Sequence, residues 1–127
     1  MADSPKAGKL LRSSVSLSVN MVNLYDRIEK KSYLKNQLAR AATAIGANIH
    51  EASYAESGED FIHKLRIALK ECHETEYWLT VLNECIPQLT EETHILRKDA
   101  GAIRNMLISS INTRLISLGK AKWNNPN

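Results

Sequence analysis

The chain has 127 residues, of which 43% are hydrophobic and 24% are charged, and its formal net charge is +3. This length suits one domain with its own core, and a count of only five glycines and three prolines argues against a β-fold with many turns. No apolar run approaches the roughly 20 residues needed to cross a bilayer, and the first residues lack the apolar core of a signal peptide, so we expect a cytoplasmic protein without a membrane segment.

The first predicted helix covers about residues 9–30. Its core stripe has heptad-like spacing and consists of Leu10, Ser14, Leu17, Met21, Leu24 and Ile28. A second apolar line lies beside this stripe and consists of Leu11, Val15, Val22 and Tyr25. The two lines together form a wider face than one neighbouring helix can cover, so we expect this helix to meet two neighbours or another subunit.

The second predicted helix covers about residues 33–55 and follows a very short connection, in which Ser32 has the chemistry of an N-cap. Its apolar stripe consists of Leu34, Leu38, Ala41, Ile45, Ile49 and Ala52. A line of very small residues lies beside the stripe and consists of Ala39, Ala42 and Gly46. A glycine inside a helix costs about 1 kcal/mol relative to alanine, so the unbroken pattern around Gly46 predicts that another backbone packs very close to it.

The third and fourth predicted helices cover about residues 58–86 and 91–118. Ser57 is the expected N-cap of the third helix, which ends before Pro87, and its seam consists of Phe61, Leu65, Ala68, Cys72, Thr75, Leu79, Leu82 and Ile86. Thr90 is the expected cap of the fourth helix, and Gly119 is its expected C′ residue. The core stripe of the fourth helix consists of Leu96, Ala100, Ile103, Leu107, Ile111, Leu115 and Leu118. In the polar tail, residues 119–127, only Trp123 is expected to dock.

Four long helices joined by short turns predict an all-α fold, an antiparallel up-down-up-down four-helix bundle that forms one domain over residues 1–127. Apolar residues outside the core stripe of the fourth helix, together with the second line of the first helix, predict a homo-oligomer; on the fourth helix they are Ile95, Met106, Ile108 and Ile116. Cys72 and Cys85 fall in one helix, roughly 20 Å apart, so we expect two buried packing thiols and no disulfide.

Several polar residues fall on or beside the apolar seam of the second helix. Asn48 lies where that seam continues, and Arg40 and Glu51 flank the same turns. Buried polar groups are costly unless they are paired, and such pairing commonly fixes register or oligomeric state. The third helix offers possible partners for them, at Lys64, Glu71 and Glu74. We therefore expect a structural polar network.

Catalytic and metal-binding patterns are weak in this sequence. Two carboxylate–histidine pairs have the spacing used in di-iron bundles, Asp60 with His63 and Glu91 with His94, but helix capping explains the acids in those first turns. Cys72 and His73 are adjacent, hence about 100° apart around a helix, and cannot act as nucleophile and base. The five glycines stand singly, which excludes a phosphate-binding glycine loop. We predict no enzymatic activity, no metal and no cofactor.

Basic residues gather in two groups. The first surrounds the first turn and consists of Arg27, Lys30, Lys31 and Lys35, and the second runs along the fourth helix and its tail at Arg97, Lys98, Arg104, Arg114, Lys120 and Lys122. Solvated helix faces account for both groups, and nucleic-acid binding is the functional alternative. Because few aromatic residues lie near either group, any such binding should be directed to the backbone and tolerant of sequence.

Two stretches of the sequence resemble a known bacterial family. They read QLARAATAIGANIHEA in the second helix and DFIHKLRIALKECHETEYWL in the third. Both are similar to the four-helix-bundle proteins that are encoded in intervening sequences of large-subunit ribosomal RNA genes, often labelled ribosomal proteins. That family is related to the accessory variability proteins of diversity-generating retroelements. The match covers about residues 10–118, and it departs from the family pattern at His50 and Tyr54.

The resemblance implies a homopentamer around a central channel. It also implies two kinds of partner, because the retroelement relatives bind nucleic acid and a reverse transcriptase. Two hypotheses follow for this chain. One is a non-enzymatic oligomeric scaffold that binds the RNA or DNA backbone, and the other is a protein-interaction adaptor, for example for a reverse transcriptase, with no nucleic-acid binding of its own.

Overall fold

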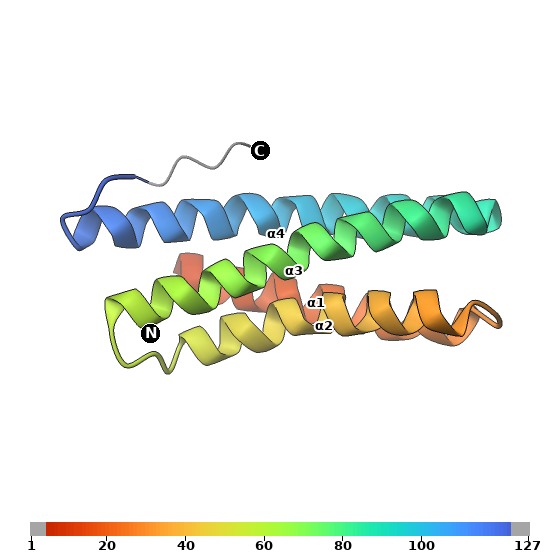
Figure 1. The fold of residues 1–127 in the computed structure, drawn as a ribbon, viewed down its shortest axis with the longest axis horizontal. Helices are drawn as coiled ribbons and strands as arrows, with labels where there is room; N and C mark the ends of the chain where they lie inside the picture. The colour runs from red at the N-terminus through yellow and green to blue at the C-terminus, as the bar shows by residue number, and fades with distance from the viewer. Residues whose placement is uncertain (1–4, 123–127) are drawn as a thin grey trace.

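The computed structural model of the chain describes residues 5–122. These residues form four long α-helices and a short 3-10 helix, with no β-strand among them (Figure 1). The helices are α1 (Pro5–Arg27), α2 (Ser32–Ala52), α3 (Gly58–Cys85) and α4 (Thr90–Ser117), and the 3-10 helix η1 (Pro87–Leu89) precedes α4. The prediction of an all-helical bundle is confirmed for this part of the chain.

Each long helix packs against two others. Helix α1 contacts α2 and α4, and α3 contacts the same two helices. The connections α1–α2 and α3–α4 lie at one end of the bundle and the connection α2–α3 lies at the other (Figure 1). Ion pairs join helices at both ends of the bundle. Arg27 at the end of α1 lies 2.6 Å from Glu92 in the first turn of α4, and Lys120 lies 3.8 Å from Glu59 in the first turn of α3.

The α1–α2 connection differs from the prediction. Helix α1 begins at Pro5 rather than near residue 9 and ends at Arg27 rather than near residue 30. The expected cap by Ser32 is wrong, because Ser32 is already helical and Lys31 before it has the left-handed conformation, with φ 64° and ψ 47°. A side-chain hydrogen bond spans this connection, because Nζ of Lys35 donates to the carbonyl oxygen of Ile28 at 2.8 Å.

The α2–α3 connection shows the predicted cap. Helix α2 ends at Ala52, earlier than the expected residue 55, and Oγ of Ser57 accepts a hydrogen bond from the Asp60 backbone amide at 3.1 Å. The Asp60 carboxylate accepts from the backbone amide of Glu56 at 3.2 Å, one residue before the amide that a standard capping box would use.

At the two ends of α4, one prediction is wrong and the other is confirmed. The expected cap by Thr90 is wrong: this residue is the first of α4, and its hydroxyl donates backwards to the Pro87 carbonyl oxygen at 2.6 Å. At the other end, Gly119 has φ 72°, and hydrogen bonds from Gly119 to Ile116 and from Lys120 to Leu115 form the predicted glycine stop. Helix α4 itself ends at Ser117, and Trp123 lies outside the described residues.

The core runs the length of the bundle and is built from the predicted stripes. Gly46 is buried and faces Ser14 of α1, which is 0% exposed. A Cβ atom built on Gly46 would lie 3.1 Å from the Ser14 hydroxyl oxygen and 3.6 Å from its carbonyl oxygen. The prediction of two buried thiols is wrong for one of them, because Cys72 is buried but Cys85, at the end of α3, is exposed; neither forms a disulfide.

Apolar side chains outside the core gather on α1. Val15, Val19 and Val22 are 53%, 52% and 51% exposed, and their spacing places them along one side of the helix. Two other members of the predicted second line, Leu11 and Tyr25, pack against the core instead. On α4, Ile95 and Ile116 are exposed, whereas Met106 and Ile108 are partly buried. None of the described helices combines the length and apolar character that a membrane span requires.

Candidate functional site

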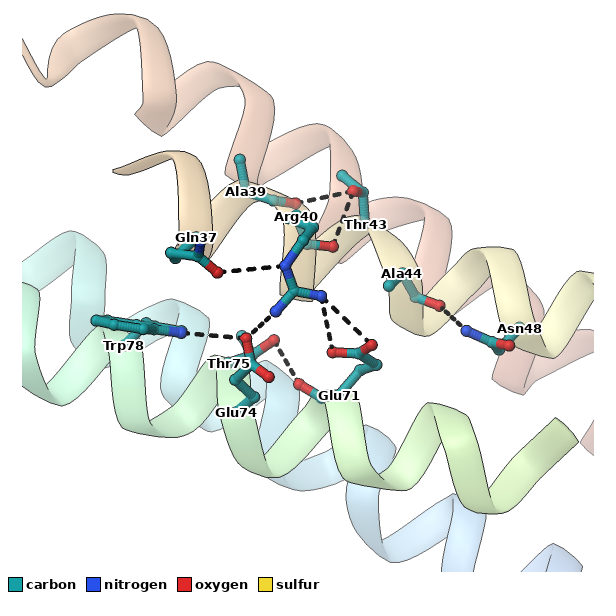
Figure 2. A network of polar contacts seen from close by, with 10 residues as sticks. All are labelled: Gln37, Ala39, Arg40, Thr43, Ala44, Asn48, Glu71, Glu74, Thr75 and Trp78. Carbon is teal, nitrogen blue, oxygen red and sulfur yellow. Dashed lines mark hydrogen bonds and ion pairs between the residues drawn. The ribbon is translucent and has the colours of Figure 1, made fainter. Parts of the chain in front are cut away.

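A polar network joins the outer edges of α2 and α3. The Arg40 guanidinium lies 3.3 Å from a carboxylate oxygen of Glu71 and forms a second ion pair with Glu74 (Figure 2). Its Nε donates to Gln37, and the Trp78 indole N–H donates to Glu74 at 3.2 Å. The Arg40 side chain is 47% exposed, so solvent screens these pairs and each contributes at most about 1 kcal/mol.

The other polar residues expected in this network lie apart from it. Glu51 pairs with Lys64 at 3.7 Å, nearer the α2–α3 connection. The side-chain amide of Asn48 donates to the Ala44 carbonyl oxygen of its own helix at 2.9 Å (Figure 2). The residues expected in one network thus form two separate ion-pair groups and one amide that bonds within α2.

Another charged pair, between α3 and α4, was not expected from the sequence. Nη1 of Arg104 lies 2.6 Å from Oε2 of Glu76, and both side chains are about three-quarters buried, at 28% and 25% exposure. The other Glu76 oxygen and Nε of Arg104 are buried without a hydrogen-bond partner in the part of the chain that the structure describes. Arg104, one of the residues expected to contact nucleic acid, is thus paired with a carboxylate inside the protein.

Cys72 lies beside this pair and is not a nucleophile. Burial raises the pKa of the Cys72 thiol to about 12, and the negative charge of Glu76 adds to the rise while Arg104 opposes it. The thiol therefore stays protonated near neutral pH, whereas nucleophilic cysteines need the thiolate. No three His, Cys, Asp or Glu side chains lie close enough to hold a metal ion within residues 5–122.

In the first basic group, some side chains make contacts within the protein and others do not. Arg27 pairs with Glu92, whose pKa is lowered by a backbone hydrogen bond and then by this guanidinium. Lys35 donates to the Ile28 carbonyl and lies 4.4 Å from the centre of the Tyr25 ring. Lys30 and Lys31 are exposed, and no ion pair or hydrogen bond engages their side chains within the described chain.

The second basic group divides in the same way. Besides Arg104, Arg114 makes a contact within the protein: its guanidinium lies over the Phe61 ring in a cation–π contact, 4.7 Å from the ring centre. Arg97 and Lys98 are exposed, and among the residues of the structure neither has an ion-pair partner. Of the eight basic residues that the sequence proposed as nucleic-acid contacts, the four whose side chains make no ion pair, hydrogen bond or ring contact within the described chain are Lys30, Lys31, Arg97 and Lys98.

An aromatic cluster beside the α1–α2 connection was missed by the sequence reasoning. Tyr33, at the start of α2, meets Trp78 of α3 edge to face, with ring centroids 6.1 Å apart. Tyr77, the residue before Trp78 in the chain, also meets its ring edge to face, with ring centroids 5.1 Å apart. Tyr33 is 71% exposed and Tyr77 is 60% exposed. The only sequence signal was the pair Tyr77-Trp78, which gave no indication that Tyr33 would join it.

Three shallow depressions lie along the surface of the described chain. Two of about 260 and 300 Å³ lie between α1 and α4; one is lined by Asn20, Asn23 and Ile95 among others, and the second by Ser13, Ser16 and Met106. A third, of about 440 Å³, lies at the α2–α3 connection beside the Glu51–Lys64 pair. Its lining includes His50 and Tyr54, whose rings contact each other edge to face.

Comparison with known proteins shows a family and a fold. The model of a family described as 23S rRNA-intervening sequence protein matches residues 7–109. The chain is also similar to the crystal structure of a protein with unknown function from the S23 ribosomal protein family of Bacteroides thetaiotaomicron. The two are 39% identical, the alignment covers 84% of this chain and 97% of that chain, and the TM-score is 0.78. No curated protein matches the chain.

Proposed function

This chain belongs to the 23S rRNA-intervening sequence protein family, and we propose that it is a non-enzymatic, oligomeric helical scaffold of the cytoplasm that binds the phosphate backbone of RNA or DNA. The observation that carries this proposal is the presence of two pairs of adjacent exposed cations, Lys30 with Lys31 and Arg97 with Lys98, whose charges are not used within the described chain. A cation that is not engaged by a carboxylate can neutralise a phosphate and release its counterions.

The proposed assembly is a homopentamer of antiparallel up-down-up-down bundles, as the family resemblance implies. Two observations support it. The valine stripe of α1, which consists of Val15, Val19 and Val22, leaves an apolar face uncovered in the single chain. Four cations per subunit also make a weak site by themselves, whereas a ring would repeat each pair five times, so that individually weak phosphate contacts add through multivalency.

The experiment is fluorescence anisotropy with labelled mixed-sequence RNA and DNA at two salt concentrations, run beside light scattering. Binding should be present at low salt and should fall steeply as salt rises. The double variant Lys30→Glu/Lys31→Glu should weaken binding and leave the oligomer intact. Lys9→Glu/Lys70→Glu, which changes the net charge equally at two exposed positions elsewhere, is the matched control. Equal losses from both variants would show that only net charge matters and would overturn the assigned site.

A second test of the same site should raise the affinity for nucleic acid instead of lowering it. Glu29 and Glu91 are exposed acids, one beside Lys30 in the chain and the other near the start of α4, and they lower the positive potential there. Neutralising them as Glu29→Gln/Glu91→Gln should therefore strengthen binding at low salt. A weaker complex would contradict binding at this end of the bundle.

A protein-interaction adaptor, for a reverse transcriptase or another protein, is the second candidate. The valine stripe favours it, because three β-branched side chains at helical spacing give an apolar surface that a partner helix can cover. Absence of any nucleic-acid binding at low salt by an intact oligomer would reject the scaffold proposal in its nucleic-acid form and leave the adaptor.

A further inference from the structure

The aromatic cluster of Tyr33, Tyr77 and Trp78 lies next to the lysine pair of the α1–α2 connection. Tyr33 follows Lys31 by two positions, and Trp78 of α3 holds it from the side. The fold therefore places two exposed rings, and the partly buried ring of Trp78, next to cations that no carboxylate of the described chain pairs with. The Tyr33 and Tyr77 rings do not serve the core, because more than half of each residue remains exposed to solvent, whereas Trp78 is partly buried and packs against the core.

The cluster is fixed in place by its surroundings. The Trp78 indole N–H is anchored on Glu74, and the carboxylates of Glu74 and Glu71 are in turn paired with Arg40 (Figure 2). This pairing reduces the negative charge that would otherwise repel a phosphate beside the rings. It also holds Trp78 in one orientation, so that a ligand would lose little conformational freedom of the protein on binding.

We propose that Tyr33, Tyr77 and Trp78 form a stacking platform for unpaired bases, so that the protein prefers single-stranded RNA or DNA to a duplex. This inference rests on the proposed function, since Lys30 and Lys31 supply the phosphate contacts. In a duplex the faces of the bases are already stacked on one another, whereas a single strand presents them to aromatic side chains. The edge-to-face geometry, with interplanar angles of 77° and 71°, turns the rings of the cluster in different directions, so successive bases would stack on different rings.

The test compares a labelled mixed-sequence single strand with the duplex of the same sequence, both at low salt. The chain has two tryptophans, so the Trp123→Phe background makes Trp78 the reporter of stacking through quenching of its fluorescence. The single strand should bind at least about fivefold more tightly than the duplex and should quench Trp78. Tyr33→Ala/Tyr77→Ala should weaken single-strand binding by about fivefold or more and leave duplex binding unchanged.

Tyr54→Ala is the matched control, because Tyr54 is 76% exposed and lies beyond the other end of α2. It should change neither affinity. Equal binding of single strand and duplex, unaffected by the double tyrosine variant, would overturn the platform while leaving backbone binding intact. No binding of either nucleic acid would overturn both proposals. A change in molar mass of the double variant in light scattering would identify the cluster as a contact between subunits and would also overturn the platform.

Discussion

Replacing Gly46 by leucine should destabilise the protein, because α1 fills the space beside this residue. The nearest atom, the Ser14 hydroxyl oxygen, can rotate away, but the Ser14 carbonyl belongs to a helix backbone and lies 3.6 Å from the position of a Cβ. The outer atoms of leucine would have to displace that backbone. Overpacking typically costs about 1 to 3 kcal/mol, and a backbone obstacle favours the upper part of this range. Leucine recovers somewhat less than 1 kcal/mol of helix propensity, so the net loss is about 2 kcal/mol.

Thermal unfolding followed by circular dichroism measures this loss, and Gly101→Leu is the matched control. A Cβ on Gly101 would meet only Nη2 of Arg104, at 3.7 Å, which is an ordinary van der Waals contact, so that variant gains helix propensity without overpacking. A loss of about 2 kcal/mol corresponds to a fall in Tm of roughly 8 °C for a domain of this size, whereas the control should rise slightly. Equal Tm values for the two variants would refute the close packing of α1 on α2 at Gly46.

Four further predictions concern single positions. Ser57→Ala removes the N-cap of α3 and should lower the free energy of unfolding in urea by about 1 kcal/mol. Lys31→Gly should raise it by up to about 1 kcal/mol, because glycine adopts the left-handed conformation without steric cost; a loss would contradict this. In the folded protein at pH 8, a thiol reagent followed by mass spectrometry should modify Cys85 and spare Cys72. Since the folded-state pKa of Cys72 is raised from 9.0 to about 12, its contribution to stability, measured against Cys72→Ala, should be constant below pH 9 and fall as pH rises towards 12.

The helices of this chain are predictable because their apolar stripes are long and uninterrupted. The α3 seam from Phe61 to Leu82 is buried at every predicted position. The ends of the helices are less predictable, because a capping side chain works only if the backbone before the helix is extended. Ser57 has that conformation and caps α3, whereas Ser32 and Thr90 have suitable side chains but lie inside their helices.

The candidate site was less predictable than the fold, because it depends on contacts between helices. Whether a basic side chain meets a carboxylate is set by the rotation and register of two packed helices, which the period of one helix does not determine. Arg104 and Lys98 both read as surface cations on α4, yet one is paired with Glu76 and the other is exposed. The meeting of Tyr33 with Trp78 likewise required the start of α2 to lie beside the last part of α3.

The difference between paired and unpaired cations separates the expected effects on stability from those on the proposed nucleic-acid binding. Arg104→Met would leave Glu76 partly buried without its cation, and an unpaired buried group of this kind costs about 1 to 3 kcal/mol. The same substitution should leave affinity for nucleic acid unchanged, since its guanidinium is engaged between α3 and α4. Lys31→Gln should behave in the opposite way, because its exposed ammonium group makes no contact that folding depends on. Urea unfolding measures the stability of both variants, and fluorescence anisotropy measures their affinity for nucleic acid. A loss of affinity from Arg104→Met in a protein that remains folded would show that the paired cation also contacts the ligand. Pairing within the chain would then be the wrong criterion for choosing the binding residues.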